Sequence, residues 1–246
     1  MIETDWSRKY SDCIISNQLL DVNKKSPEGF IDDLKMKYLK EYLPDNGTIV
    51  EVGAGSGRLL TRVGLENRNY RLIGFDYESL PVILIKNNLE KFSLNGTSMC
   101  ANAFKIPIKS NSVNVLLSGG FLEHFNEIEI NFIIQEMYRI LKPNGIMYAD
   151  IVPGISSLCR PIILTKEYGG YENNFSKRQW NEILIKNGFK SPRIFRGCVI
   201  PPNFYGWCRS GPQLKLMYKI QKLINNLDNT IISEYLGFMF YVFARK

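Results

Sequence analysis

The stretch from Thr48 to Leu60, TIVEVGAGSGRLL, constrains this chain more than any other part of its sequence. It begins with an apolar run broken only by Glu51, which is typical of a strand buried on both faces of a parallel sheet. A glycine-rich turn follows, and Arg58 then opens a helical pattern. Because glycines let a backbone turn sharply and a helix N-terminus offers free N–H groups, this order predicts a cradle for a cofactor. The residues expected to form it are Glu51, Gly53, Ala54, Gly55, Ser56 and Gly57.

The spacing of the glycines distinguishes two classes of cofactor. A dinucleotide fingerprint, G-x-G-x-x-G, would place its third glycine at position 58, where this chain has Arg58. The observed E-V-G-A-G-S-G instead resembles the first motif of the class I methyltransferases that use S-adenosylmethionine (SAM). A NAD-type oxidoreductase is therefore the less favoured alternative.

A carboxylate ends the second predicted strand, Tyr70 to Asp76, 19 residues after Gly57. An acid at this place lies beside the first strand's glycine loop, where its oxygens can accept both hydroxyls of a ribose. The position resembles the second methyltransferase motif, which implies that Asp76 and its neighbour Tyr77 contact the cofactor. A solvent-exposed aspartate in a turn is the alternative.

An amide replaces an acid after the third predicted strand, which we place at Met99 to Phe104. The family reads roughly D-A-x-x-L-P-F here, and this chain has Asn102-Ala103. The resemblance implies that Asn102, Ala103 and Phe104 surround the adenine, since an amide oxygen can still accept a hydrogen bond from its amino group. Phe104 could equally be an ordinary core residue.

The fourth predicted strand, Ser112 to Ser118, carries a second change of this kind at Asn114 and leads into the run L-E-H-F, which matches the family closely. The resemblance implies that backbone carbonyls near Ser118 and Gly119 face the methionine ammonium of SAM. It also places His124, the chain's single histidine, near the reacting methyl group. An imidazole there could act as a general base. The alternative is a histidine that caps the following helix.

The remaining pattern predicts an α/β fold. R-I-L-K-P-N-G resembles the family's R-x-L-K-P-G-G turn, and helices alternate with strands along the chain. We predict a doubly wound, mostly parallel, seven-stranded sheet of Rossmann-like type, with the last strand, Gly237 to Ala244, antiparallel and with helical lid elements. The resemblance extends in motif detail from Gly47 to Val152.

We predict a single methyltransferase domain over residues 1–246. Its expected parts are an N-terminal lid and first helix at 1–46, a SAM-binding core at 47–152, and an acceptor-side half at 153–246 with a lid insertion at about 201–234. The basic amphipathic stretch Gln213 to Leu227 lies within the insertion. We interpret it either as a mobile helix over the acceptor site or as a helix packed permanently on the core.

Charge is unevenly distributed along the chain. Residues 1–159 hold 17 Lys and Arg against 19 Asp and Glu, whereas residues 160–246 hold 14 against 5, so the net charge of +7 comes from the C-terminal third. This excess suits an anionic or sugar-like acceptor or an anionic membrane surface, and a solvated basic face explains it equally well. We do not expect nucleic acid as the main partner, and the sequence does not indicate an oligomeric state.

Other features restrict the environment and the chemistry. The five cysteines are scattered without a C-x-x-C pair, so we expect neither disulfides nor a metal site, and a cytoplasmic protein is the expectation. The N-terminus MIETDWSRKY is polar and unlike a signal peptide, and no apolar run approaches the ~20 residues of a membrane span.

The resemblance implies SAM-dependent transfer of a methyl group to an oxygen, nitrogen or carbon nucleophile of a small-molecule acceptor, with S-adenosylhomocysteine as the second product. Within the family, the sequence is most similar to the small-molecule group that includes enzymes of the ubiquinone and menaquinone pathways. A non-catalytic SAM-binding partner subunit remains an alternative.

Overall fold

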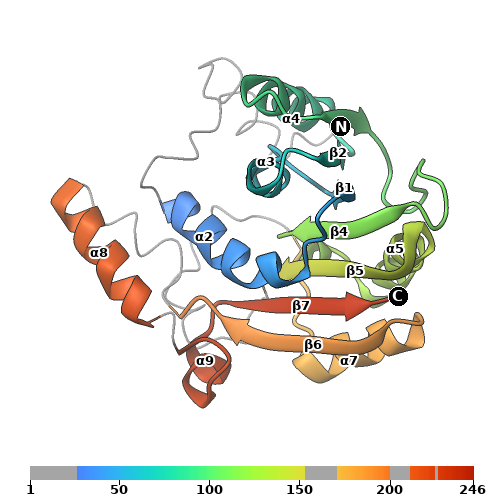
Figure 1. The fold of residues 1–246 in the computed structure, drawn as a ribbon. Coiled ribbons are helices and arrows are strands. Elements are labelled where there is room, and N and C mark those ends of the chain that lie inside the picture. The colour runs from blue at the N-terminus through green and yellow to red at the C-terminus, as the bar shows by residue number, and fades with distance from the viewer. Residues whose placement is uncertain (1–26, 153–170, 200–210, 225–226) are drawn as a thin grey trace.

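A computed structural model describes residues 27–152, 171–199, 211–224 and 227–246 of the chain (Figure 1). Its strands form one seven-stranded sheet in the order β3-β2-β1-β4-β5-β7-β6, with β7 antiparallel to both of its neighbours. The predicted fold class is therefore confirmed, including the antiparallel last strand. The strands are β1 Gly47–Val52, β2 Tyr70–Asp76, β3 Gly96–Cys100, β4 Val113–Gly119, β5 Leu141–Ile151, β6 Lys190–Gly197 and β7 Met239–Arg245.

Helices cover both faces of this sheet. Alternation along β1 shows the two sides: Ile49 belongs to a hydrophobic cluster with α2 and α3, and Val50 to a second cluster with α5 and α7. The described helices are α2 Pro27–Leu39, α3 Arg58–Glu66, α4 Ser79–Lys91, α5 Glu127–Ile140, α7 Lys177–Lys186, α8 Gly211–Ile224 and α9 Ile231–Leu236, with two 3-10 helices, η1 Lys40–Tyr42 and η2 Leu122–His124. No helix in these ranges is both long and apolar enough to cross a membrane.

The predicted third strand was placed too late in the chain. β3 ends at Cys100 rather than at Phe104. The side-chain oxygen of Asn102 accepts the backbone N–H of Phe104 at 2.9 Å, and this local hydrogen bond turns the chain away from the sheet. Asn102 and Phe104 consequently lie in the loop beyond the strand.

The carboxyl ends of the parallel strands share one edge of the sheet, and α2 runs across it (Figure 1). Lys35 of α2 forms an ion pair of 2.8 Å with Asp150, near the end of β5. In an open α/β sheet, ligands bind at this edge, outside the strand ends. The ends of β1, β2, β4 and β5 therefore form the candidate site.

Candidate functional site

The glycine loop after β1 adopts a backbone that other residues rarely take. Gly53, Gly55 and Gly57 have φ values of 64°, 51° and 68°, in the left-handed region. A Cβ on Gly53 would lie 2.2 Å from the ring of Phe121, so this glycine is also required by packing. The loop therefore needs glycine at each of these positions, as a cradle for a closely approaching ligand does.

Asp76 is bound directly to the glycine loop. Its Oδ2 accepts the backbone N–H of Gly55 at 2.9 Å, and its Oδ1 accepts the N–H of Glu78 at 3.3 Å. Burial raises the pKa of this partly buried carboxyl above its ordinary value, against the lowering effect of these hydrogen bonds. A carboxylate has about four acceptor positions, so capacity for ribose hydroxyls remains. The adjacent Tyr77 is 78% exposed.

Glu51 points into the protein. Its side chain is 3% exposed, and its Oε2 accepts the backbone N–H of Leu60 at 3.0 Å. Gly57, at the N-cap of α3, has no side chain to cap that helix, so the strand supplies the missing acceptor. Burial raises the pKa of Glu51 to about 8. In the structure Glu51 contacts α3, and its contact with the cofactor stays a prediction.

The middle of the loop is fixed from α4. The side-chain amide of Asn88, which is buried, donates to the backbone carbonyl of Ser56 at 2.9 Å. Ala54 is buried, and its N–H donates to the carbonyl of Phe75 in β2 at 3.0 Å. The cradle is thus held by both neighbouring elements before any ligand binds.

Three aromatic rings line up beside this loop. Phe104, which is 39% exposed, makes an edge-to-face contact with Phe125, with 5.9 Å between the ring centroids. Phe125 makes a second edge-to-face contact with Phe121, with 4.8 Å between the centroids. Ala103 is buried in the core cluster beneath them. Phe121 and Phe125 were not among the predicted site residues, although both flank the L-E-H motif. An exposed ring face at this place suits a nucleobase.

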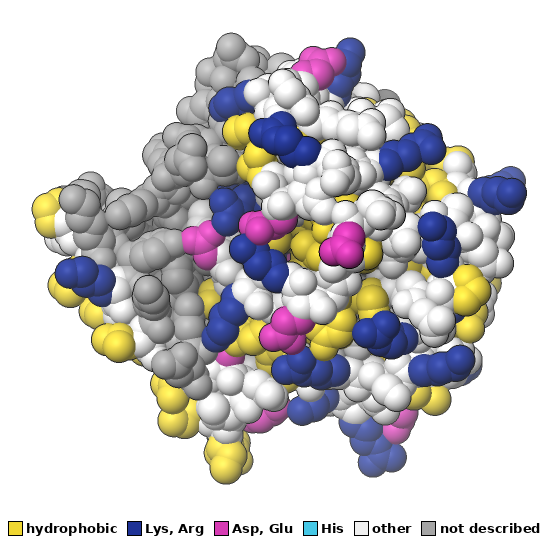
Figure 2. All heavy atoms as spheres, in the orientation of Figure 1, with side chains coloured by type: hydrophobic (Ala, Val, Ile, Leu, Met, Phe, Trp, Pro, Cys, Tyr) yellow, Lys and Arg dark blue, Asp and Glu magenta, His cyan; other side chains and the backbone are white. Residues whose placement is uncertain are grey.

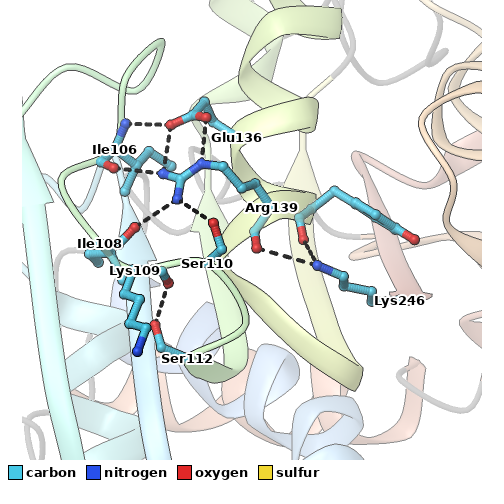
Figure 3. A network of polar contacts seen from close by, with 9 residues as sticks. Ile106, Ile108, Lys109, Ser110, Ser112, Glu136, Arg139 and Lys246 are labelled. Carbon is cyan, nitrogen blue, oxygen red and sulfur yellow. Dashed lines mark hydrogen bonds and ion pairs between the residues drawn. The ribbon is translucent and has the colours of Figure 1, made fainter.

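Arg139, in the R-I-L-K-P-N-G turn, anchors the loop that carries Ala103 and Phe104 (Figure 3). Its Nε and Nη2 donate to the two oxygens of Glu136 at 2.7 and 2.9 Å. Nη2 and Nη1 also donate to the carbonyls of Ile106 and Ile108 at 2.8 and 2.9 Å, and Nη1 donates to the hydroxyl of Ser110 at 3.1 Å. The loop between β3 and β4 is therefore fixed by one guanidinium.

The ends of β4 and β5 form the polar part of the site. Ser118 is 1% exposed, and a Cβ on Gly119 would lie 3.1 Å from Asp150 and 3.4 Å from the ammonium of Lys35. Burial disfavours the charge of Lys35, but the carboxylates of Asp150, Asp32 and Glu51 together outweigh that effect and raise the pKa of the lysine. An intact ion pair therefore adjoins the predicted Ser118 and Gly119. Sequence reasoning missed both of its members.

Two further ion pairs connect α2 to α3. Asp32 pairs with Arg58, the first residue of α3, and Asp33 pairs with Arg62 one turn later. These contacts connect α2 to the helix that begins at the glycine loop. The described part of the predicted N-terminal segment thus packs over the site.

His124 is the last residue of η2, the short helix that follows Phe121, whose ring packs on Gly53. Its Nδ1 is 3.2 Å from the backbone carbonyl of Tyr171. Because a carbonyl only accepts, this contact requires Nδ1 to carry the proton, which leaves Nε2 as an acceptor in the neutral ring. The alternative that His124 caps the following helix is wrong, because the side chain of Asn126 caps α5.

Glu123, beside His124, is 2% exposed, and its Oε1 accepts the N–H of Val152 at 3.1 Å. Burial raises the pKa of Glu123 to about 8. The described residues contain no cluster of His, Cys, Asp or Glu that could hold a metal ion.

Together, these residues fit a nucleoside with a polar aliphatic tail. The glycines of the loop carry no side chain where a ligand would approach. Asp76 offers acceptors for hydroxyls, and Phe104 offers a partly exposed aromatic ring. Residues 50–149 match the family model described as a methyltransferase domain. The match identifies a methyltransferase domain in this part of the chain, residues 50–149 of 246. The predicted resemblance is confirmed, and the narrower likeness to the ubiquinone and menaquinone group stays a prediction.

Relatives of this methyltransferase domain are distant. An uncharacterised methyltransferase of Schizosaccharomyces pombe is 30% identical over 141 residues, which cover 54% of this chain and 51% of that protein. The chain therefore spans about half the length of this relative. A tRNA (guanine-N(7)-)-methyltransferase of Mycoplasma capricolum is 28% identical over 80% of this chain and 73% of its own length.

A solved structure shares the fold. Phosphoethanolamine N-methyltransferase 2 of Haemonchus contortus, in complex with SAM, superposes with a TM-score of 0.62 at 18% identity. The match covers 99% of this chain and 57% of that one. At this identity the likeness supports the fold of the methyltransferase domain.

Proposed function

We propose that this protein transfers the methyl group of SAM to a nucleophile of a small-molecule acceptor. The observation that carries the proposal is the bond between Gly55 of the glycine loop and Asp76 at the end of β2. It places an acid and a glycine-rich turn together at the carboxyl edge of the sheet. When bound, SAM supplies an activated methyl group on a sulfonium, and the protein's task is to align the acceptor and exclude water.

Different residues are proposed to bind different parts of the cofactor. Asp76 accepts the ribose hydroxyls, Asn102 and Phe104 contact the adenine, and the backbone near Ser118 and Gly119 holds the methionine end. The left-handed backbone of Gly53, Gly55 and Gly57 supports this assignment, because these three positions carry no side chain that would oppose a close ligand. Tyr77 is proposed as a peripheral contact because most of its side chain is exposed.

His124 is the proposed general base for an oxygen or nitrogen acceptor. Its Nδ1 is engaged by the carbonyl of Tyr171, which orients the ring and leaves Nε2 free to accept a proton. An acceptor carrying a phosphate or another anion is consistent with the basic C-terminal third. The phosphorylated acceptor named for the Haemonchus contortus enzyme supports this class.

The first experiment is calorimetry with SAM, S-adenosylhomocysteine and NAD. We expect the first two to bind and NAD not to bind. Binding of NAD alone would overturn the proposal in favour of an oxidoreductase. The second experiment incubates the protein with methyl-labelled SAM and three acceptor sets: phosphorylated amines, phosphorylated sugars and bulk tRNA. Label in tRNA alone would overturn the small-molecule acceptor, and SAM binding without any labelled product would favour a partner subunit.

We also propose the three-part division of the domain, with the acceptor-side half beginning at residue 153. Hydrogen exchange decides between the two interpretations of Gln213–Leu227. A lid should exchange quickly in the free protein and gain protection with cofactor and acceptor. Protection in the free protein equal to that of β1 would rule the lid out.

A further inference from the structure

Large apolar side chains are exposed on the two consecutive helices α8 and α9. We name these five residues the α8–α9 surface: Leu216, Leu223, Ile231, Ile232 and Tyr235. Their exposed fractions are 59%, 75%, 80%, 45% and 65%. Scattered apolar residues are normal on a protein surface, but a local group of this kind marks a site of interaction.

The helical spacing places these residues on common faces. Leu216 and Leu223 are two turns apart on α8, and the exposed Lys219 lies between them on the same side. Ile231 and Tyr235 are one turn apart on α9. Figure 2 shows hydrophobic side chains along the left and lower left margin of the molecule, where α8 and α9 lie in Figure 1. A flat partner could therefore touch both helices.

The charge of this region identifies the kind of partner. The sequence of α8, GPQLKLMYKIQKLI, contains three lysines and no acidic residue, and it lies within the strongly basic part of the chain. α9 adds the acid Glu234, which forms an ion pair of 3.1 Å with Lys177. A surface of apolar residues and lysines, with this acid paired, matches the boundary between acyl chains and anionic headgroups. The exposed apolar pair Ile128 and Phe132 of α5 differs, because Glu127 and Glu129 flank it.

The position of α8 connects this surface to the site. Figure 1 shows α8 beyond the carboxyl ends of β4, β5 and β6. The glycine loop follows the carboxyl end of β1, and His124 in η2 follows that of β4, which is parallel to β1. A surface that held α8 would therefore face the same side as the candidate site.

We propose that the α8–α9 surface binds an anionic lipid membrane at its interface. The leucines and isoleucines enter the region between headgroups and acyl chains, and Lys219 contacts lipid phosphates. This inference goes beyond the proposed methyl transfer and does not depend on it, since lipid binding is measured without cofactor or acceptor.

The test is co-sedimentation with two kinds of vesicle, pure phosphatidylcholine and an equal mixture of phosphatidylcholine and phosphatidylglycerol. We expect the protein to partition at least about tenfold better onto the anionic vesicles. The double variant L216Q/L223Q should lose at least about tenfold of that partition, because two exposed apolar side chains no longer enter the interface. The control variant I128Q/F132Q removes a similar exposed apolar pair from α5 and should partition within about twofold of the wild type.

A second variant guards against misfolding of the first. Lys219→Glu reverses one exposed charge, and it should lower partition onto anionic vesicles about fivefold or more while leaving circular dichroism unchanged. Failure of the wild type to sediment with anionic vesicles would overturn the proposal, as would equal partition of L216Q/L223Q. Conversion of a wild-type dimer to a monomer by L216Q/L223Q, with lipid partition unchanged, would identify a second copy of the chain as the true occupant.

Discussion

Replacing Arg139 by methionine should both destabilise the protein and weaken cofactor binding. The side chain donates to Glu136, to two backbone carbonyls and to a hydroxyl, all within 2.7–3.1 Å. Methionine keeps the apolar stem and removes every one of these bonds. The loop that follows Phe104 would then lose its main attachment to α5.

The magnitude follows from these contacts. A net hydrogen bond contributes about 1 kcal/mol, and one to a charged group about 1.5–3 kcal/mol. The Arg139 side chain is 35% exposed, so water replaces part of what is lost. We therefore expect the free energy of unfolding to fall by about 2–3 kcal/mol in urea titrations. Affinity for S-adenosylhomocysteine should fall about 3- to 10-fold in calorimetry, because ordering the loop then costs binding energy.

Arg178 provides the matched control. It pairs with Glu182 one helical turn away, as Arg139 pairs with Glu136, but its side chain is 88% exposed. Arg178→Met should leave the urea midpoint of unfolding unchanged, because water replaces this exposed ion pair. If Arg139→Met and Arg178→Met unfold at the same urea concentration, the guanidinium does not hold the loop and the reasoning is refuted.

Three further outcomes are expected. Gly55→Val should abolish calorimetric binding of SAM in a folded protein, because position 55 has a φ of 51° and faces the cradle; unchanged affinity would contradict this role. Asp76→Ala should weaken SAM binding by roughly 10- to 150-fold, which is the equivalent of one charged hydrogen bond of ~1.5–3 kcal/mol. The control variant Asp45→Ala should bind SAM as the wild type does. A change under about threefold in Asp76→Ala would exclude Asp76 as the ribose ligand. Glu123→Gln should flatten the dependence of stability on pH. The pKa of Glu123 is raised from 4.5 to about 8 in the folded protein, so its contribution is fully present below about pH 4.5 and is lost as pH rises through about 8. Urea midpoints at about pH 5 and about pH 8 that differ equally in variant and wild type would show that Glu123 does not titrate in this way.

The features that could be located from the sequence depend on local signals. The glycine loop and the carboxylate of Asp76 follow directly from one strand each, and a strand end at the edge of a parallel sheet fixes where they lie. The fold class followed from the alternation of helices and strands. The end of β3 was misplaced because the side chain of Asn102 accepts the backbone N–H of Phe104, which a sheet would otherwise pair. Composition does not show which of the two partners this N–H will have.

The parts that were missed depend on contacts between distant segments. Lys35 and Asp150 form one ion pair although 115 residues separate them in the sequence. Gly53 follows β1 and Phe121 follows β4, so only the fold brings the ring of Phe121 against the glycine loop. The pattern of the first strand likewise could not show that an oxygen of Glu51 accepts the N–H of Leu60 in α3, and its contact with the cofactor stays a prediction.

The sheet order also governs when the protein can be completed. Among the described strands, β6 pairs only with β7, and β7 is made more than 40 residues after it. While the chain is being synthesised, β6 therefore waits as an unpaired strand, and β5 keeps an open edge that only β7 closes. Closure of such distant pairs is slow, because the entropy of the intervening loop is lost before the contacts form. The half of the sheet that carries the methyltransferase motifs can thus assemble early, whereas the half that includes α8 and α9 is completed last.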